Sequence, residues 1–171
     1  DPPPDPRGLT AELRPYQRAG FHWLHALWEA GLGGILADDM GLGKTVQTLA
    51  LLEHARGAGE LTEPVLVVAP TSMLGVWAGE AARFTPELRV VVLGETTKRR
   101  GESLAETVAD ADLVITSYAV ARIDGDAFGD LQWRGLILDE AQFVKNHHGK
   151  THHVLRGLRA QRGVLREAAG D

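Results

Sequence analysis

The sequence has no cysteine among its 171 residues. A small secreted scaffold held together by disulfides is therefore excluded. Long apolar runs are also missing: the strongest ones, at 65–69 and 136–138, are strand-sized, far short of the roughly 20 residues that span a bilayer. Positive charge is not in excess, since 18 lysines and arginines face 23 acidic residues, for a formal net charge of -5. A broadly basic nucleic-acid coat is thus excluded, although a local cationic groove is not.

The remaining composition, 44% hydrophobic and 24% charged, is typical of one globular domain. The chain begins at Asp1 with no initiator methionine and no charged-then-apolar leader, so we expect a piece of a longer protein without a secretion signal. Four of the eight prolines lie in the first six residues, which predicts a linker or arm over residues 1–10.

The rest of the chain alternates short apolar runs with helical patterns. Uninterrupted Val, Ile and Leu runs are typical of parallel strands buried on both faces, and they occur at 34–37, 65–69, 89–93, 112–116 and 135–138. Helical patterns begin at Pro15, with Gly31 as a stop, and cover 44–56, 72–84 and 101–109. This order predicts a doubly wound α/β domain over 11–161, with ligands beyond the carboxyl ends of its strands.

A glycine loop follows the first apolar run and precedes a helix. It reads Asp38-Asp39-Met40-Gly41-Leu42-Gly43-Lys44-Thr45. The two glycines let backbone N–H groups face phosphate oxygens at a helix N-terminus. Lys44 adds positive charge and the Thr45 hydroxyl is a ligand for Mg²⁺, which are the roles of a Walker A motif. The usual first glycine is replaced by Asp38, so a plain glycine turn before an amphipathic helix remains an alternative.

An acidic pair, Asp139 and Glu140, follows the last apolar run. Asp139 is suited to hold Mg²⁺, mostly through water, and Glu140 to orient or deprotonate the water that attacks the γ-phosphate. An acidic turn that only caps the strand is the structural alternative. Because the acidic pair occurs in a chain that also has a phosphate loop, the catalytic interpretation is favoured.

Five ordered segments resemble the Swi/Snf-type, helicase-like ATPases of helicase superfamily two. These segments are 13–17 (LRPYQ), 36–45 (the phosphate loop), 68–72 (VAPTS, motif Ia), 115–118 (ITSY, motif Ib) and 138–146 (LDEAQFVKN, a DEAH-type box). An aspartate at position 38 is normal in that family. The resemblance implies an N-terminal RecA-like lobe that binds ATP and Mg²⁺ and moves on double-stranded DNA. The expected location is the cytoplasm of a bacterial-type cell, on the nucleoid when bound to DNA.

The same resemblance assigns roles to residues. Gln17 would contact adenine, Lys44 and Thr45 the phosphates and Mg²⁺, and Asp139 and Glu140 the metal and the attacking water. Small hydroxyls at predicted strand ends can grip a DNA phosphate without reading bases, or can instead cap the helices that follow. The candidates are Thr71, Ser72, Thr116 and Ser117, of which Thr71 and Thr116 are preferred.

Two departures from the family pattern stand out. Gln142 replaces the histidine of many relatives but still offers a donor and an acceptor for coupling to a second lobe. Residues 162–171 do not match motif III, which predicts a divergent or truncated tail, with the C-terminal RecA-like lobe and its arginine fingers supplied elsewhere. We therefore expect the chain alone to hydrolyse ATP weakly or not at all.

Two other functions remain open from the sequence. One is a strand-separating DNA or RNA helicase of the same superfamily, although the segment 143–146 favours the translocase. The other is a gene fragment that binds nucleotide without catalysis. Three further features are interpreted as structural or solvated: the histidine-rich segment 147–153, the basic run 98–100, and Trp77, which we expect in the core.

Overall fold

The computed structural model describes residues 1–30 and 44–139. Within them lies a four-stranded sheet in the order β2-β3-β1-β4, formed by Val90–Leu93, Leu113–Ser117, Val65–Ala69 and Gly135–Leu138. All neighbouring strands are parallel, with Val65 of β1 opposite both Leu113 and Gly135. The α/β class and the parallel sheet predicted from the sequence are confirmed. The apolar run at 34–37 lies outside the described residues.

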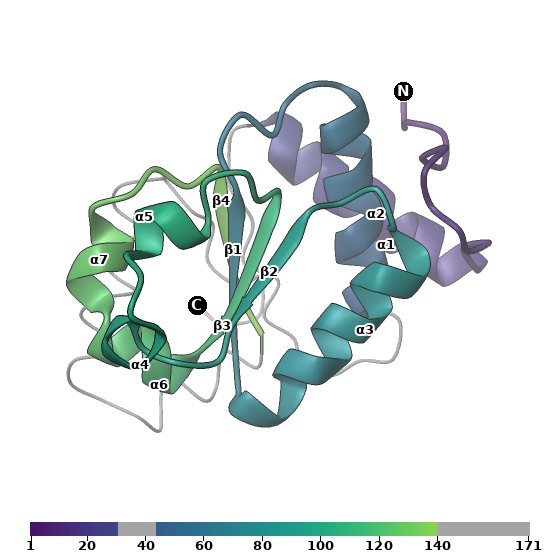
Figure 1. The fold of residues 1–171 in the computed structure, drawn as a ribbon. Coiled ribbons are helices and arrows are strands. Elements are labelled where there is room, and N and C mark those ends of the chain that lie inside the picture. The colour runs from purple at the N-terminus through teal and green to yellow at the C-terminus, as the bar shows by residue number, and fades with distance from the viewer. Residues whose placement is uncertain (31–43, 140–171) are drawn as a thin grey trace.

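Helices cover both faces of the sheet (Figure 1). One face carries α1, α2 and α3, and the other carries α4 to α7. Because successive strand residues point to opposite faces, β1 divides its side chains between two cores. Val65, Val67 and Ala69 join the cluster under α1 to α3, whereas Leu66 and Val68 join the cluster under the other helices. All five residues of β1 are buried, which explains why its sequence does not alternate.

The helices agree with the sequence patterns on the first face and differ on the second. The first-face helices are α1 (Pro15–Glu29), α2 (Lys44–Gly57) and α3 (Leu74–Phe84), with a 3-10 turn, η1 (Thr71–Met73), before α3. On the second face, the helix expected over 101–109 was wrong: two short helices, α4 (Thr97–Arg100) and α5 (Leu104–Thr107), flank a break. Gly101 ends α4 with φ 77°, a left-handed conformation.

The second face contains two more short helices that the sequence patterns did not predict. These are α6 (Tyr118–Ile123) and α7 (Gly125–Gly129), which connect β3 to β4. Ser117 caps α6, because its Oγ accepts a hydrogen bond of 3.1 Å from the Val120 N–H. Helices this short show too few periodic apolar positions for a pattern to reveal them.

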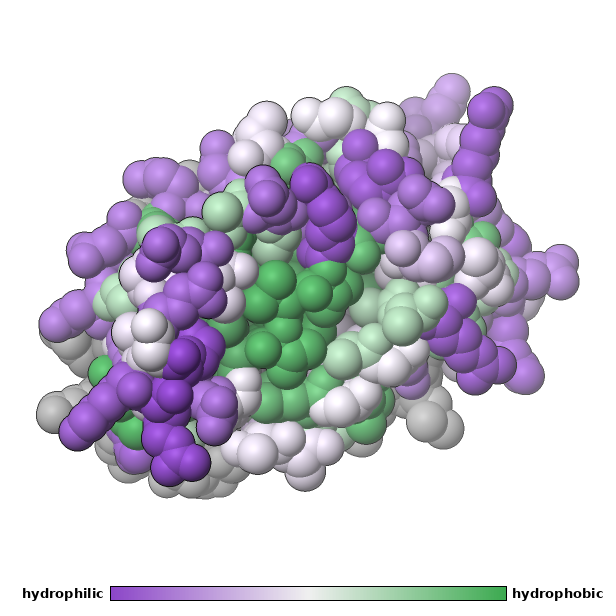
Figure 2. All heavy atoms as spheres, in the orientation of Figure 1, coloured by the Kyte–Doolittle hydropathy of each residue, from purple (hydrophilic) through white to green (hydrophobic). Residues whose placement is uncertain are grey.

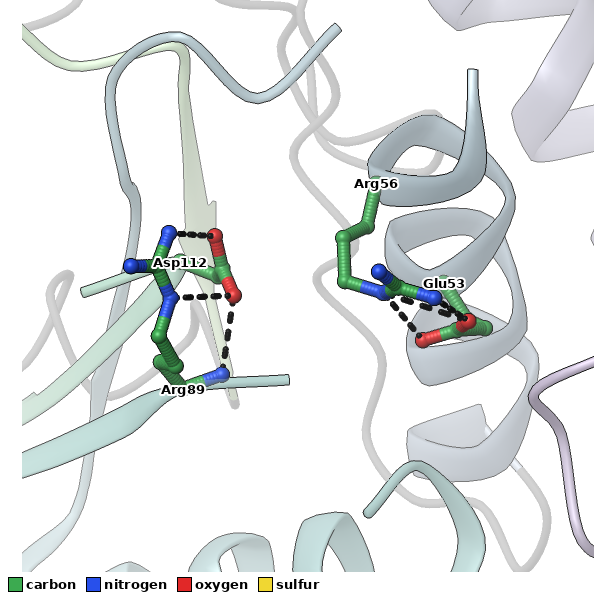
Figure 3. Close-up of polar contacts among 4 residues, drawn as sticks. All are labelled: Glu53, Arg56, Arg89 and Asp112. Carbon is green, nitrogen blue, oxygen red and sulfur yellow. Dashed lines mark hydrogen bonds and ion pairs between the residues drawn. The ribbon is translucent and has the colours of Figure 1, made fainter. Parts of the chain in front are cut away.

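Two buried carboxylates are paired with arginines (Figure 3). The side chain of Glu53 is 2% exposed and receives Nη2 of Arg56 at 2.7 Å, one helical turn away on α2. The side chain of Asp112 is 4% exposed and accepts the backbone N–H of Arg89 at 2.9 Å as well as its guanidinium. These hydrogen bonds raise the pKa of both guanidinium groups. Each pair satisfies a carboxylate that burial would otherwise penalise.

The proline-rich start of the chain is an arm that lies against the first face. Residues 1–14 contain neither helix nor strand, in agreement with their proline content. Both carboxylate oxygens of Asp5 accept from Arg18 of α1, at 2.9 and 2.8 Å, and Leu9 is buried in the core under α1 to α3. The domain boundary drawn between this arm and the lobe stays a prediction.

Apolar atoms also reach the surface over the sheet, where Figure 2 shows a green area between the two groups of helices. Strand β2 is the outermost described strand at this side, and Val92 on it is 42% exposed. None of the helices in residues 1–30 and 44–139 has the length and apolar content that a bilayer crossing requires.

Candidate nucleotide-binding site

The carboxyl ends of the strands form one edge of the sheet, and polar residues gather there. Because β1, β3 and β4 are parallel and in register, Thr71, Ser117 and Asp139 leave the sheet at the same side. The backbone N–H of Asp139 donates to the Val68 carbonyl at 2.9 Å, which extends the β1–β4 pairing to the site. The predicted position of Asp139 at a strand end is confirmed.

Asp139 is held at three atoms by residues from both faces of the sheet. Besides its backbone N–H, its backbone carbonyl accepts from the Tyr118 hydroxyl of α6 at 2.9 Å. Its carboxylate oxygen Oδ2 accepts from the indole Nε1 of Trp77 on α3 at 2.8 Å. The half-buried carboxylate thus has a fixed place at the edge of the sheet.

Lys44 and Thr45 form the first turn of α2. Both side chains are half-buried, and the helix after them is almost entirely buried, with Leu49, Ala50 and Leu52 fully enclosed. The N-terminus of a helix carries partial positive charge and exposes N–H groups. A lysine and a hydroxyl at this end of a rigid helix are suited to bind phosphate. The preceding loop, Asp39–Gly43, lies outside the described residues.

Gln17, predicted to contact adenine, lies in the first turn of α1. Its side-chain oxygen accepts a hydrogen bond of 2.8 Å from the Arg14 backbone N–H, which closes the start of that helix. The residue is half-buried. This hydrogen bond uses the carbonyl oxygen and fixes the direction of the amide nitrogen, which is a donor. Contact with adenine stays a prediction.

The four hydroxyls proposed for DNA differ sharply in exposure. Thr71 and Ser72 are exposed in η1, at the edge that holds Asp139. Thr116 is fully buried and donates to the Leu93 carbonyl of β2 at 2.9 Å, and Ser117 is 3% exposed and caps α6. In this structure both hydroxyls serve the fold: Ser117 caps a helix, as the capping alternative expected, whereas Thr116 bonds the neighbouring strand β2. The preference for Thr116 therefore has no support from its geometry, and DNA contact stays a prediction for Thr71 and Ser72.

The residues described at the site fit Mg²⁺ by the chemistry of their donors. The Asp139 carboxylate and the Thr45 hydroxyl supply hard oxygen atoms, which Mg²⁺ prefers, usually with several waters retained. An ionised carboxylate has about four acceptor positions, and the bond from Trp77 uses one of them. Among residues 1–30 and 44–139 there is no group of three or more His, Asp or Glu side chains that could hold a metal by themselves. The Asp139 carboxylate and the Thr45 hydroxyl are thus the described groups that fit a hydrated Mg²⁺.

The model of the SNF2-related domain family matches residues 16–165 of this sequence. The chain belongs to that family. The Swi/Snf resemblance and the RecA-like fold inferred from the motifs are confirmed.

Individual relatives show how much of a SNF2-related protein the chain represents. It is 42% identical to YwqA of Bacillus subtilis over 147 residues, which are 86% of this chain and 16% of that protein. It is 41% identical to the ATP-dependent DNA helicase DDM1 of Arabidopsis thaliana over 160 residues, 90% of this chain and 21% of that protein. The chain therefore spans about a fifth or less of the length of these relatives.

A solved structure agrees with the same lobe. The SWI2/SNF2 ATPase core of Sulfolobus solfataricus, solved in complex with double-stranded DNA, is 39% identical, with a TM-score of 0.77. The match covers 91% of this chain and 31% of that one.

Three predicted site residues or segments lie outside the described part of this SNF2-related chain: the loop Asp39–Gly43, the proposed base Glu140, and Gln142. The structure adds two residues that sequence reasoning missed. Tyr118 and Trp77 both hydrogen-bond Asp139. A signal for Trp77 was present, because a buried indole N–H needs an acceptor, but the sequence does not say which one.

Proposed function

We propose that this chain is the ATP-binding lobe of a Swi/Snf-type DNA-dependent ATPase that translocates on double-stranded DNA and remodels protein–DNA complexes. A C-terminal RecA-like lobe would complete the site. The observation that carries the proposal is the fixed Asp139 carboxylate at the sheet edge that also presents Thr71 and Ser72, in a chain of the SNF2-related family. The double-stranded DNA bound to the Sulfolobus core supports DNA as the partner.

The proposed chemistry assigns each group one task. The first turn of α2, with Lys44, binds the phosphates of ATP, and Gln17 at the start of α1 orients the adenine. Thr45 and Asp139 hold Mg²⁺, which would neutralise the charge that develops on the phosphoryl oxygens. Glu140 orients the attacking water and accepts its proton. Thr71 and Ser72 grip a DNA phosphate, and Gln142 communicates nucleotide state to the other lobe.

The first test is binding of Mg·ATP to the 171-residue chain, measured by calorimetry. We expect Lys44→Ala to abolish binding, because it removes the charge at the helix N-terminus that faces the phosphates. Lys98→Ala is the matched control: this lysine is exposed on α4, on the opposite face, and its loss should leave binding unchanged. Equal affinities of the unsubstituted chain and Lys44→Ala would disprove the phosphate site.

The second test separates translocation from the other two functions. In a two-lobed protein that contains this lobe, Glu140→Gln should retain ATP binding and lose DNA-stimulated turnover. Displacement of a triplex-forming strand from duplex DNA without separation of the duplex would support the translocase. Separation of a forked duplex would support the strand-separating helicase. Binding of nucleotide without turnover in that two-lobed protein would identify a non-catalytic lobe.

A further inference from the structure

Trp77 is buried, yet its one polar atom points at the acidic end of β4. The side chain is 2% exposed and lies with Leu74 and Ala81 on the buried face of α3. Its Nε1 donates to Oδ2 of Asp139 at 2.8 Å, across 62 residues of sequence. The indole is therefore a core residue, as expected, and also the neighbour of the proposed metal ligand.

The other indoles show that this partner is not the default for a buried tryptophan. Trp133 is 1% exposed and donates to a backbone carbonyl, that of Phe128, at 2.8 Å. Trp28 donates to the Glu60 carboxylate at 2.8 Å, and its ring lies near Gly135, at the amino end of β4. Either kind of acceptor satisfies an indole N–H. Burial alone therefore does not dictate the kind of acceptor, and Trp77 finds its acceptor at the carboxyl edge of the sheet.

The three hydrogen bonds of Asp139 restrain two different parts of the residue, its backbone and its side chain. The bonds to Val68 and from Tyr118 fix its backbone, but they leave the side chain free to rotate. The Trp77 bond acts on the carboxylate itself, at Oδ2. A hydrogen bond to a charged acceptor is short and directional, so it restrains the rotation of the carboxylate and the direction of its other lone pairs.

We propose that Trp77 is a positioning residue, whose indole N–H holds the Asp139 carboxylate in the orientation that receives the hydrated Mg²⁺ of the bound nucleotide. The inference rests on the proposed function, since it assigns a partner to the Mg²⁺ ligand of that site. Partners of this kind, which orient a metal ligand without touching the metal, typically change metal affinity about 10- to 100-fold when removed.

The test uses Trp77→Phe, which keeps an aromatic ring and deletes the N–H donor. Trp133→Phe is the matched control, because it deletes an equally buried indole donor on the opposite face of the sheet. The probe is ADP with a fluorescent N-methylanthraniloyl label, bound to the 171-residue chain first in EDTA and then during a titration with MgCl₂.

A positioning role predicts a specific loss of metal affinity. In Trp77→Phe, the Mg²⁺ concentration that gives half of the metal-dependent signal should rise about tenfold, while affinity for the labelled ADP in EDTA stays as in the unsubstituted chain. In Trp133→Phe both quantities should stay unchanged. Equal Mg²⁺ dependence in the two variants would overturn the inference, whatever stability each has lost.

A double variant checks that the effect runs through the carboxylate. Asp139→Ala removes the acceptor and the proposed ligand together. Adding Trp77→Phe to Asp139→Ala should then produce no further change in Mg²⁺ dependence. A further tenfold loss in the double variant would show that Trp77 acts by another route and would overturn the inference.

A spectroscopic measurement keeps the proposal testable if Trp77→Phe does not fold. The chain has four tryptophans and so four indole N–H signals, each assignable by NMR. Addition of Mg²⁺ to the ADP-bound chain should shift the Trp77 signal and leave that of Trp133 in place. No shift at Trp77 would overturn the inference.

The two proposals fail in distinguishable ways. If the unsubstituted chain binds no nucleotide, the proposed function is wrong and the inference falls with it. If the chain binds nucleotide through Lys44 but Trp77→Phe and Trp133→Phe behave alike, only the role of Trp77 is wrong.

Discussion

Gly20 lies where α1 meets α2. Its replacement by alanine should stabilise the helix by its higher helix propensity and destabilise the packing between the two helices. A Cβ at this position would overlap the side-chain amide of Gln47, closer than the 3.0 Å that real Cβ contacts keep. Gln47 is 5% exposed and so has little room to withdraw. The contact also concerns the site, because Gly20 follows Gln17 by one helical turn and Gln47 follows Lys44 by one turn.

The expected loss of folding stability is the difference between the helix-propensity gain and the cost of overpacking. In a helix interior, Gly→Ala gains about 1 kcal/mol of intrinsic helix stability. Overpacking of a tight interface costs about 1–3 kcal/mol, so Gly20→Ala should be destabilised by up to about 2 kcal/mol. Gly79→Ala on α3 is the matched control, since no atom lies within 4 Å of its would-be Cβ. That control should gain about 0.5–1 kcal/mol.

The difference between the two variants isolates the interface, because the helix term is common to both. Urea unfolding should place Gly20→Ala about 1–3 kcal/mol below Gly79→Ala, which corresponds to roughly 2–4 °C in Tm for each kcal/mol. In a Gln47→Ala background the side-chain amide that the new Cβ would meet is absent, so Gly20→Ala should then lower the free energy of unfolding far less. Equal stabilisation of Gly20→Ala and Gly79→Ala would refute the packing of α1 on Gln47.

Two predictions concern charge. Arg18 hydrogen-bonds Asp5 and lowers the pKa of that carboxyl. The ion pair therefore stabilises the docked arm fully at pH values above 3.8, the ordinary pKa of the Asp5 carboxyl. This stabilisation is lost as the pH falls through the lowered pKa that Asp5 has in the folded chain. Asp5→Asn should loosen the arm at neutral pH, so that trypsin cleaves after Arg7 about two- to fivefold faster; an unchanged rate would contradict the docking. On α3, burial raises the pKa of Glu80 against the opposing charge of Arg83. Protonated Glu80 therefore contributes to the stability of the fold below pH 4.5, and this contribution is lost as the pH rises through the raised pKa of the folded state. Glu80→Gln, which stays neutral, should raise Tm at pH 7 but not at pH 4.

Sequence patterns alone were enough to locate the strands of the sheet and the phosphate-loop helix. The predicted runs at 65–69 and 135–138 are the observed β1 and β4, and the helix predicted over 44–56 is observed one residue longer. These elements are buried along their length, and a strand buried on both faces needs an uninterrupted apolar run. Their burial therefore shows directly in the sequence.

The order of the polar residues along the chain was equally informative about the site. Asp139 follows a buried parallel strand, so its place at the carboxyl edge follows from topology. Lys44 and Thr45 precede an apolar helix, so their place at its N-terminus follows in the same way. Local patterns located these groups because each one is defined by its distance along the chain from a buried element.

Which hydroxyls and donors face the site became clear from the packing of the fold and not from local patterns. Thr71 and Thr116 both follow or end apolar strands, yet one is exposed and the other donates to Leu93 of a neighbouring strand. The bond from Trp77 to Asp139 joins α3 to β4 across 62 residues, and no periodicity within either segment encodes it. The partner of a buried polar group is set by whatever the fold brings within 3 Å of it, and that proximity is a property of packing between distant segments.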